Sequence, residues 1–179
     1  KVTLRAAENP DPYNLKFNCE DEEVVTIINA AKNTLAQNGL DLFMDCPGRE
    51  RSGWINDIFF TRKAAEVLTG NNLIEKNSLQ NYAMCEQNPS LPEGMVPMCY
   101  PADHFNGEFI PNCAMWYGIN VCEYCIKTGD DTFAAQIKDQ IYGIIKYFEG
   151  FENEHGLLED LESWVFVEWS EANSKPFVS

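Results

Sequence analysis

The feature that most constrains the fold is a series of segments with helical periodicity, each bounded by residues that end helices. In the first, residues 21–39, apolar side chains recur at the spacing of one helix face, acidic residues begin the segment and Gly39 ends it. Nothing in the pattern supports a parallel sheet or a second domain. We therefore predict an all-α domain of antiparallel helical hairpins. The four segments that follow the first lie at residues 54–70, 73–85, 111–127 and 132–151.

The stretches between these segments are long and irregular. Pro10 and Pro12 prevent a regular helix near the start, so residues 1–20 are expected to be extended, with the domain proper over residues 21–179. Residues 87–109 are rich in proline and glycine and predict a long loop, a type of segment that often carries function. Residues 164–169, WVFVEW, are expected to form a short extended segment. The helical segments also carry aromatic residues that we expect in the core: Phe59, Phe60, Trp116, Tyr117, Tyr142, Tyr147 and Phe148.

The charge balance narrows the class of partner. The chain has 28 acidic and 13 basic residues among 179, giving a formal net charge of −15. Nucleic acids and anionic membranes are bound through clustered Lys and Arg, so neither is an expected partner. No apolar run is long enough to span a bilayer. A neutral ligand such as a sugar or a peptide fits this composition better.

The seven cysteines do not predict a disulfide framework, because their number is odd and the domain is not small. Cys122 and Cys125 form a CxxC motif, but a zinc site needs further ligands at suitable spacing, and His104 and His155 are isolated in the sequence. We therefore expect no metal site and no cofactor. A thiol-rich metal or redox protein is the weakest of the functional alternatives.

An unusual concentration of charged residues lies in DCPGRERSGWIND, residues 45–57. If the second helix begins near Glu50, then Glu50, Trp54 and Asp57 lie on one face of it. An indole between two carboxylates suits a sugar, whose apolar face packs on the ring while its hydroxyls donate to the carboxylates. Asp45 and Arg49 would approach from the preceding loop. The alternative interpretation is structural: acids near a helix start complement its dipole, and Trp54 belongs to the core.

Glycoside hydrolysis is the chemistry that needs carboxyl groups in different environments, one protonated and one charged. Glu50 lies next to apolar Trp54 in this arrangement, and desolvation favours the neutral form of a carboxyl group. Glu50 is therefore the expected general acid, with a raised pKa. Arg49 can hold a neighbouring carboxylate in its charged form.

The same residues resemble the signature of glycoside hydrolase family 78, the bacterial α-L-rhamnosidases. The signature stands here as Asp45-Cys46-Pro47, Arg49-Glu50, Gly53-Trp54 and Asp57. Looser likeness extends to GMVPMCYP, GEFIPNCAMWYG and WVFVEW, so that most of the chain is similar to the family's catalytic domain. One departure is the segment around Phe109, where many members have a Gly-Trp-Gly-Asp type sequence.

The resemblance implies an (α/α)6 toroid of six helical hairpins that hydrolyses terminal α-L-rhamnosyl residues with inversion. It implies Glu50 as general acid and a sugar held by Asp45, Arg49, Trp54 and Asp57. By the looser matches, Glu108, Trp164, Glu168 and Trp169 line the same pocket. Six hairpins need more helices than this sequence predicts, so the toroid is expected to be incomplete, with the general base beyond Ser179.

Two functional classes follow from this likeness. The first is the catalytic-domain portion of an inverting glycosidase acting on rhamnosyl or related residues. The second is an inactive remnant that binds carbohydrate without turnover. An incomplete toroid would leave apolar helix faces uncovered, so self-association through these faces is a further expectation. The sequence favours neither the cytoplasm nor the periplasm or cell exterior.

Overall fold

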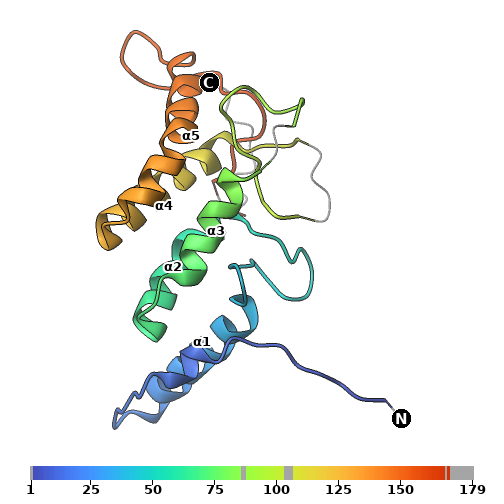
Figure 1. Cartoon of the computed structure of the whole chain (residues 1–179), viewed down its shortest axis with the longest axis vertical. Coiled ribbons are helices and arrows are strands. Elements are labelled where there is room, and N and C mark those ends of the chain that lie inside the picture. Colours follow the sequence, from blue (N-terminus) through green and yellow to red (C-terminus); the bar gives the residue numbers. More distant parts are fainter. Residues whose placement is uncertain (1, 86–87, 103–106, 168, 170–179) are drawn as a thin grey trace.

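The computed structural model describes residues 2–85, 88–102, 107–167 and 169. Over these residues the chain is all-α, as predicted, and its only β pairings are isolated bridges. Helices α2 to α5 begin and end within about two residues of the predicted segments. The elements are the 3-10 helix η1 (Asp11–Asn14) and the α-helices α1 (Glu22–Asn38), α2 (Ile55–Thr69), α3 (Leu73–Ala83), α4 (Pro111–Thr128) and α5 (Asp131–Glu149) (Figure 1).

Local capping explains where several helices start and stop. The Asp21 carboxylate accepts hydrogen bonds from the backbone N–H groups of Glu23 and Val24 at 2.9 and 3.4 Å, which starts α1. Asp130 does the same for α5 through the N–H of Phe133 at 2.9 Å. Gly70 and Gly129 end α2 and α4 with φ of 67° each, a left-handed conformation that glycine adopts without strain.

The two ends of the domain differ in the length of the segments that connect the helices. Very short turns join α2 to α3 and α4 to α5, at the left side of Figure 1. The long segments before α2, between α3 and α4, and after α5 all lie toward the opposite end. Successive helices therefore run antiparallel, and the residues 45–54 share one end of the domain with the other long loops.

The core lies between α2, α3, α4 and α5. Helix α4 packs against α2, α3 and α5, and α3 also packs against α5. Tyr82 and Tyr117 are fully buried at the centre, with ring centroids 5.4 Å apart. The Tyr117 hydroxyl donates to the carbonyl of Leu79 or to Gln140 Oε1, at 3.2 and 2.9 Å. The core is therefore held together by hydrogen bonds between buried polar groups as well as by apolar packing.

A buried charge network joins three helices. Arg62 of α2 is 3% exposed, and its Nε donates to Asn120 Oδ1 of α4 at 2.5 Å. Its other nitrogens pair with Glu75 of α3 at 3.4 Å and with Glu123 of α4. Lys127 completes the network through Glu75 at 2.7 Å. Each buried charge thus has a partner, which is the condition for burying it at all.

Two aromatic side chains expected in the core lie on the surface instead, because Phe60 and Tyr142 are 68% and 66% exposed. Apolar residues of the α1 stripe are exposed as well, Val24 to 37% and Ile27 to 60%. The apolar stripe of α1 is covered only near its end, at Leu35 and its neighbours, because α1 contacts only η1 and α2. The helix faces expected to be uncovered are therefore uncovered in this chain, while self-association through them stays a prediction.

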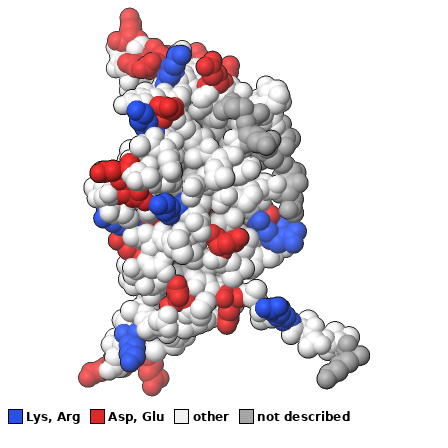
Figure 2. Space-filling model, in the orientation of Figure 1, with Lys and Arg blue, Asp and Glu red and all other residues white. Residues whose placement is uncertain are grey.

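The surface charge is dispersed. Figure 2 shows acidic and basic side chains mixed over one face of the described residues, without a continuous basic patch on that face. Among the described helices, none combines the length and the apolar character needed to cross a bilayer.

Candidate functional site

The residues of the DCPGRERSGWIND signature form a loop that ends where α2 begins, at Ile55, with Trp54 as the N-cap. The expectation that the helix begins near Glu50 is wrong. Arg51 has φ of 52°, a left-handed conformation that a right-handed helix cannot pass through. Glu50 therefore lies in the loop, and only Trp54 and Asp57 occupy the start of the helix.

Residues 45–52 form a closed loop. The Asp45 carboxylate accepts from the backbone N–H of Ser52 at 3.0 Å, and the Asp45 N–H donates to the Ser52 carbonyl at 3.1 Å. The Ser52 hydroxyl donates to the carbonyl of Glu50 at 3.0 Å. Asp45 is thus tied to the backbone of its own loop, which fixes the direction of its carboxylate.

Glu50 is held by two neighbours in this loop. Arg49 forms an ion pair with it, and the Cys46 thiol donates to its Oε2 at 3.1 Å. These two groups lower the pKa of Glu50 to about 2, with Arg49 the larger cause. The expected raised pKa is therefore wrong for this arrangement, because hydrogen bonds to the charged form outweigh desolvation.

Asp57 is the carboxyl group of the signature whose pKa is raised. Desolvation is the first cause, and the negative charges of Asp45 and Glu50 add to it. The residue as a whole is still exposed, so solvent reaches it. The mutual effects show that the three carboxyl groups lie near one another, as the sugar-binding interpretation requires.

A second loop packs against the signature. Trp54 pairs with Cys99 in an isolated antiparallel bridge, the Tyr100 N–H donates to the Gly53 carbonyl at 3.1 Å, and the Gly53 N–H donates to the Pro101 carbonyl at 3.2 Å. The buried Tyr82 hydroxyl, at the end of α3, also donates to the Gly53 carbonyl. A Cβ on Gly53 would lie 2.4 Å from the carbonyl oxygen of Tyr100, so this approach requires glycine.

Glu108 lies near this second loop. Its carbonyl accepts from the Met98 N–H at 3.2 Å. Burial raises the pKa of Cys99 to about 11, and the charges of Asp45 and Glu108 add to that rise. Asp45 and Glu108 therefore both lie close to Cys99, although they are far apart in the sequence.

Trp164 and Trp169 belong to an aromatic cluster with Phe166, and their two ring centroids lie 5.7 Å apart. The cluster is held at the start of α4, where the Phe166 N–H donates to Asn112 Oδ1 at 3.2 Å. Nearby, the Ser163 hydroxyl donates to the Phe109 carbonyl at 2.9 Å. The two indoles are 51% and 80% exposed. Residues 164–167 form no regular strand, and Glu168 lies outside the described residues.

Two contributors were not anticipated from the sequence. In the sequence Cys46 has no role beyond matching the signature, although its spacing of four residues from Glu50 is compatible with the hydrogen bond between the two side chains. Tyr82 gave no signal, because nothing local in the sequence relates it to Gly53. The donor atoms of Asp45, Cys46 and Glu50 lie within 4.8 Å of one another, a spacing that a metal ion could also use.

Comparison with known proteins places this arrangement in a family. Residues 14–178 match the model of the bacterial α-L-rhamnosidase six-hairpin glycosidase domain. The chain belongs to this family. The crystal structure of the GH78 family rhamnosidase of Bacillus sp. GL1 is similar in fold, with a TM-score of 0.75 and 21% sequence identity over 88% of the chain.

The chain spans 16% of the length of that rhamnosidase. A search of curated proteins found no match. The predicted family is thus confirmed, and so is the predicted fold of α/α-toroid hairpins. What the comparisons show for this chain is its membership of the α-L-rhamnosidase six-hairpin family.

Proposed function

We propose that this domain provides the acid side of an inverting glycosidase that removes terminal α-L-rhamnosyl or related residues from glycans or glycosides. The observation that carries the proposal is the gathering of Asp45, Glu50 and Asp57 around the start of α2, beside Trp54. The sugar is held in a loop whose backbone is already fixed. Preorganised groups of this kind bind a developing charge without first having to move.

Each residue of the signature has a role in this proposal. Asp45 and Asp57 accept hydrogen bonds from sugar hydroxyls, and the half-buried Trp54 supplies an apolar surface for the ring. Arg49, whose side chain is 87% exposed, contributes donors. Glu108, Trp164, Glu168 and Trp169 are proposed to extend the same pocket from the neighbouring loops.

Glu50 is the proposed general acid, and this role requires its proton. In the structure Arg49 keeps Glu50 charged. We propose that the sugar draws Arg49 away from Glu50, leaving the carboxyl group beside Asp45 and Asp57. Losing Arg49 removes the largest cause of the lowered pKa of Glu50, which favours protonation. A specific observation supports a second assignment: Asp57 already has a raised pKa.

The general base is proposed to lie outside these 179 residues. Inverting glycosidases separate their two carboxyl groups by about 6.5–9.5 Å, which leaves room for the attacking water. The donor atoms of Asp45 and Glu50 lie within 4.8 Å, which is too close for that arrangement. Asp45 is therefore not a suitable base for Glu50, and we propose that the base is a carboxylate facing Glu50 across the sugar from further hairpins of a complete toroid.

The test uses the full-length protein, aryl α-L-rhamnosides and NMR detection of the first anomer released. Glu50→Gln is expected to reduce kcat/KM about 10²–10⁴-fold on a substrate with a poor leaving group, and far less on a dinitrophenyl rhamnoside that needs no protonation. Asp57→Asn is expected to lower kcat/KM on both substrates similarly. If instead Asp57→Asn shows the leaving-group dependence and Glu50→Gln does not, Asp57 is the acid.

A retained anomeric configuration would contradict inversion. Binding of L-rhamnose by the wild-type protein, without hydrolysis of any rhamnoside, would favour the second candidate, an inactive carbohydrate-binding domain. This candidate is kept because Glu50 is held charged in the structure, a state that can accept sugar hydrogen bonds but cannot donate a proton.

A further inference from the structure

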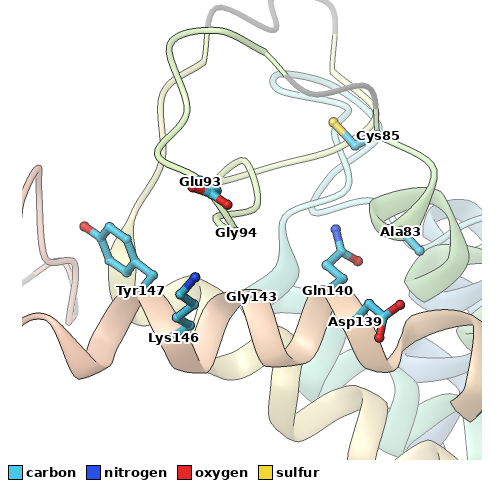
Figure 3. A pocket seen from close by; sticks show the side chains of 9 residues that line it. All are labelled: Ala83, Cys85, Glu93, Gly94, Asp139, Gln140, Gly143, Lys146 and Tyr147. Atoms are coloured by element: carbon cyan, nitrogen blue, oxygen red, sulfur yellow. The ribbon is translucent and has the colours of Figure 1, made fainter.

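A separate hollow lies between α5 and the loop that follows α3 (Figure 3). Its volume is about 600 Å³, within the range of small-molecule sites. One wall is formed by residues of α5 between Asp139 and Tyr147, and the other includes the end of α3 and residues 93–94. No residue of the 45–57 signature lines it.

The floor of the hollow is a contact between two glycines. A Cβ on Gly94 would lie 2.4 Å from the carbonyl oxygen of Gly143, and a Cβ on Gly143 would lie 3.0 Å from Gly94 Cα. Gly94 also has φ of 85°, a conformation that favours glycine. The loop therefore crosses α5 with no side chain between the two backbones, and lining residues lie on both sides of the crossing (Figure 3).

Three charged side chains border this hollow without a protein partner. Glu93 on the loop, and Asp139 and Lys146 on α5, form no hydrogen bond or ion pair within the described part of the chain. In Figure 3, Lys146 points up from α5 toward the loop that carries Glu93. Together they offer acceptors of two carboxylates and donors of one ammonium group.

The remaining polar walls are fixed by the core. Gln140 donates to the Tyr82 carbonyl at 3.2 Å and accepts from the Tyr117 hydroxyl at 2.9 Å. The Tyr147 ring packs against Phe151 with centroids 5.0 Å apart, and its hydroxyl donates to Glu162 at 3.2 Å. Tyr147 thus presents a ring that does not need to be ordered when a ligand arrives.

We propose that this hollow is a second binding site, for a neutral saccharide, distinct from the site at the start of α2. Closely spaced acceptors and donors suit a chain of vicinal hydroxyls, and a fixed aromatic ring suits the apolar face of a sugar. Two carboxylates against one ammonium, in a chain of net charge −15, disfavour an anionic ligand.

The two sites are mechanically connected. Gln140 in the wall of the hollow is bonded to Tyr82, and the hydroxyl of Tyr82 is bonded to the Gly53 carbonyl in the signature loop. A glycan held in the hollow would therefore be anchored to the same rigid core that carries the signature, and its local concentration near the domain would rise.

The test is affinity electrophoresis of the full-length protein through gels with and without a soluble neutral rhamnan. The double variant Glu93→Gln/Lys146→Met keeps the net charge and removes the two charged groups that face each other across the hollow. We expect its retardation by the rhamnan to fall at least threefold, while kcat/KM on an aryl rhamnoside stays within twofold. The matched control, Glu149→Gln/Lys138→Met, alters exposed residues of the same helix that do not line the hollow.

Glu50→Gln separates this inference from the proposed function. If the hollow binds the glycan, Glu50→Gln is retarded like the wild type even though it is a poor hydrolase. Retardation that is unchanged in the Glu93/Lys146 variant, or that is equally reduced in the control pair, would overturn the second site. No retardation of the wild type by the rhamnan or by a neutral glucan would overturn it as well.

Discussion

The hydroxyl group of Tyr82, in the last turn of α3, donates to the carbonyl of Gly53, immediately before α2. The same oxygen accepts from the N–H of Tyr100 at 3.1 Å. One buried side chain therefore holds together two loops that are separate in the sequence. The geometry of the signature depends on a residue outside it.

Tyr82→Phe should loosen both loops while keeping the packing of the ring, which is fully buried. It removes the hydrogen bonds of the hydroxyl to the Gly53 carbonyl and the Tyr100 N–H, two groups that still pair with each other, at a cost of about 1 kcal/mol in the free energy of unfolding. We expect this loss in urea denaturation of the full-length protein, together with a lower kcat/KM. Tyr142→Phe, at a position that is 66% exposed, is the control and should leave both quantities unchanged.

Gly53→Ala should be far more damaging than Gly48→Ala, although both lie in the same loop. A Cβ at Gly53 would collide with the Tyr100 carbonyl at 2.4 Å, whereas a Cβ at Gly48 meets nothing within 4 Å. We expect Gly53→Ala to lower the unfolding temperature and abolish turnover, and Gly48→Ala to do neither. Similar melting curves for the two variants would contradict the close approach seen here.

Arg62→Met should destabilise the domain by about 3–5 kcal/mol, the range for removing one member of a buried ion pair. The reason is that Glu75, whose side chain is 2% exposed, keeps only Lys127 as a charged partner. Lys63→Met, on the same helix with its side chain 49% exposed, serves as the control. Equal midpoints of chemical denaturation for the two variants would show that the network adds nothing to stability.

Arg49→Gln should raise the pKa of Glu50 from about 2 toward 4.5, because Arg49 is the largest cause of its lowering. A carboxyl group with a depressed pKa stabilises the fold above its unfolded pKa and loses that contribution as the pH falls toward 2. The variant should therefore lose less stability between pH 5 and pH 2 than the wild type, as followed by circular dichroism.

A direct reading of the same change is the carboxyl ¹³C shift of Glu50 during a pH titration. Cys46→Ala should raise the pKa of Glu50 in the same direction by removing the second donor, and Cys46→Ser should largely restore it. Arg51→Gln, a matched change two residues away, is the control. A Glu50 titration that is identical in Arg49→Gln and wild type would refute the pairing.

Much of the fold could be predicted from the sequence because helical periodicity and capping are local properties. The Gly70 and Gly129 stops, the Asp21 cap and the Pro111 start all act within a few residues. The start of α2 is predicted within one residue by the segment 54–70, whereas the alternative start near Glu50 fails because a positive φ at Arg51 has no clear sequence signal. The exposure of Phe60 and Tyr142 was not predicted because periodicity identifies an apolar face and not what covers it.

The proximity of the signature's carboxyl groups was predictable from the sequence and their electrostatics were not, while their roles in binding and catalysis stay predictions. The signature letters identified Asp45, Glu50 and Asp57, and these groups do lie close enough to affect one another. The predicted direction of the Glu50 pKa shift was wrong because it depends on whether Arg49 or solvent lies next to the carboxyl group. Only the loop conformation decides which of the two is there. The contact between Glu108 and the region of Cys99 depends on tertiary structure alone.

The Arg62 network also fixes the position of α2 along the axis of α4. Sliding α2 along α4 by one turn, about 5.4 Å, would move the guanidinium away from both Asn120 and Glu75. Intermediate positions are costly because they leave a buried charge without a partner. Helix α2 is therefore held at one position along α4. This position determines where Trp54 and Asp57, at the start of α2, lie in the candidate site. Substituting exposed residues of α2 should therefore leave these two side chains in place.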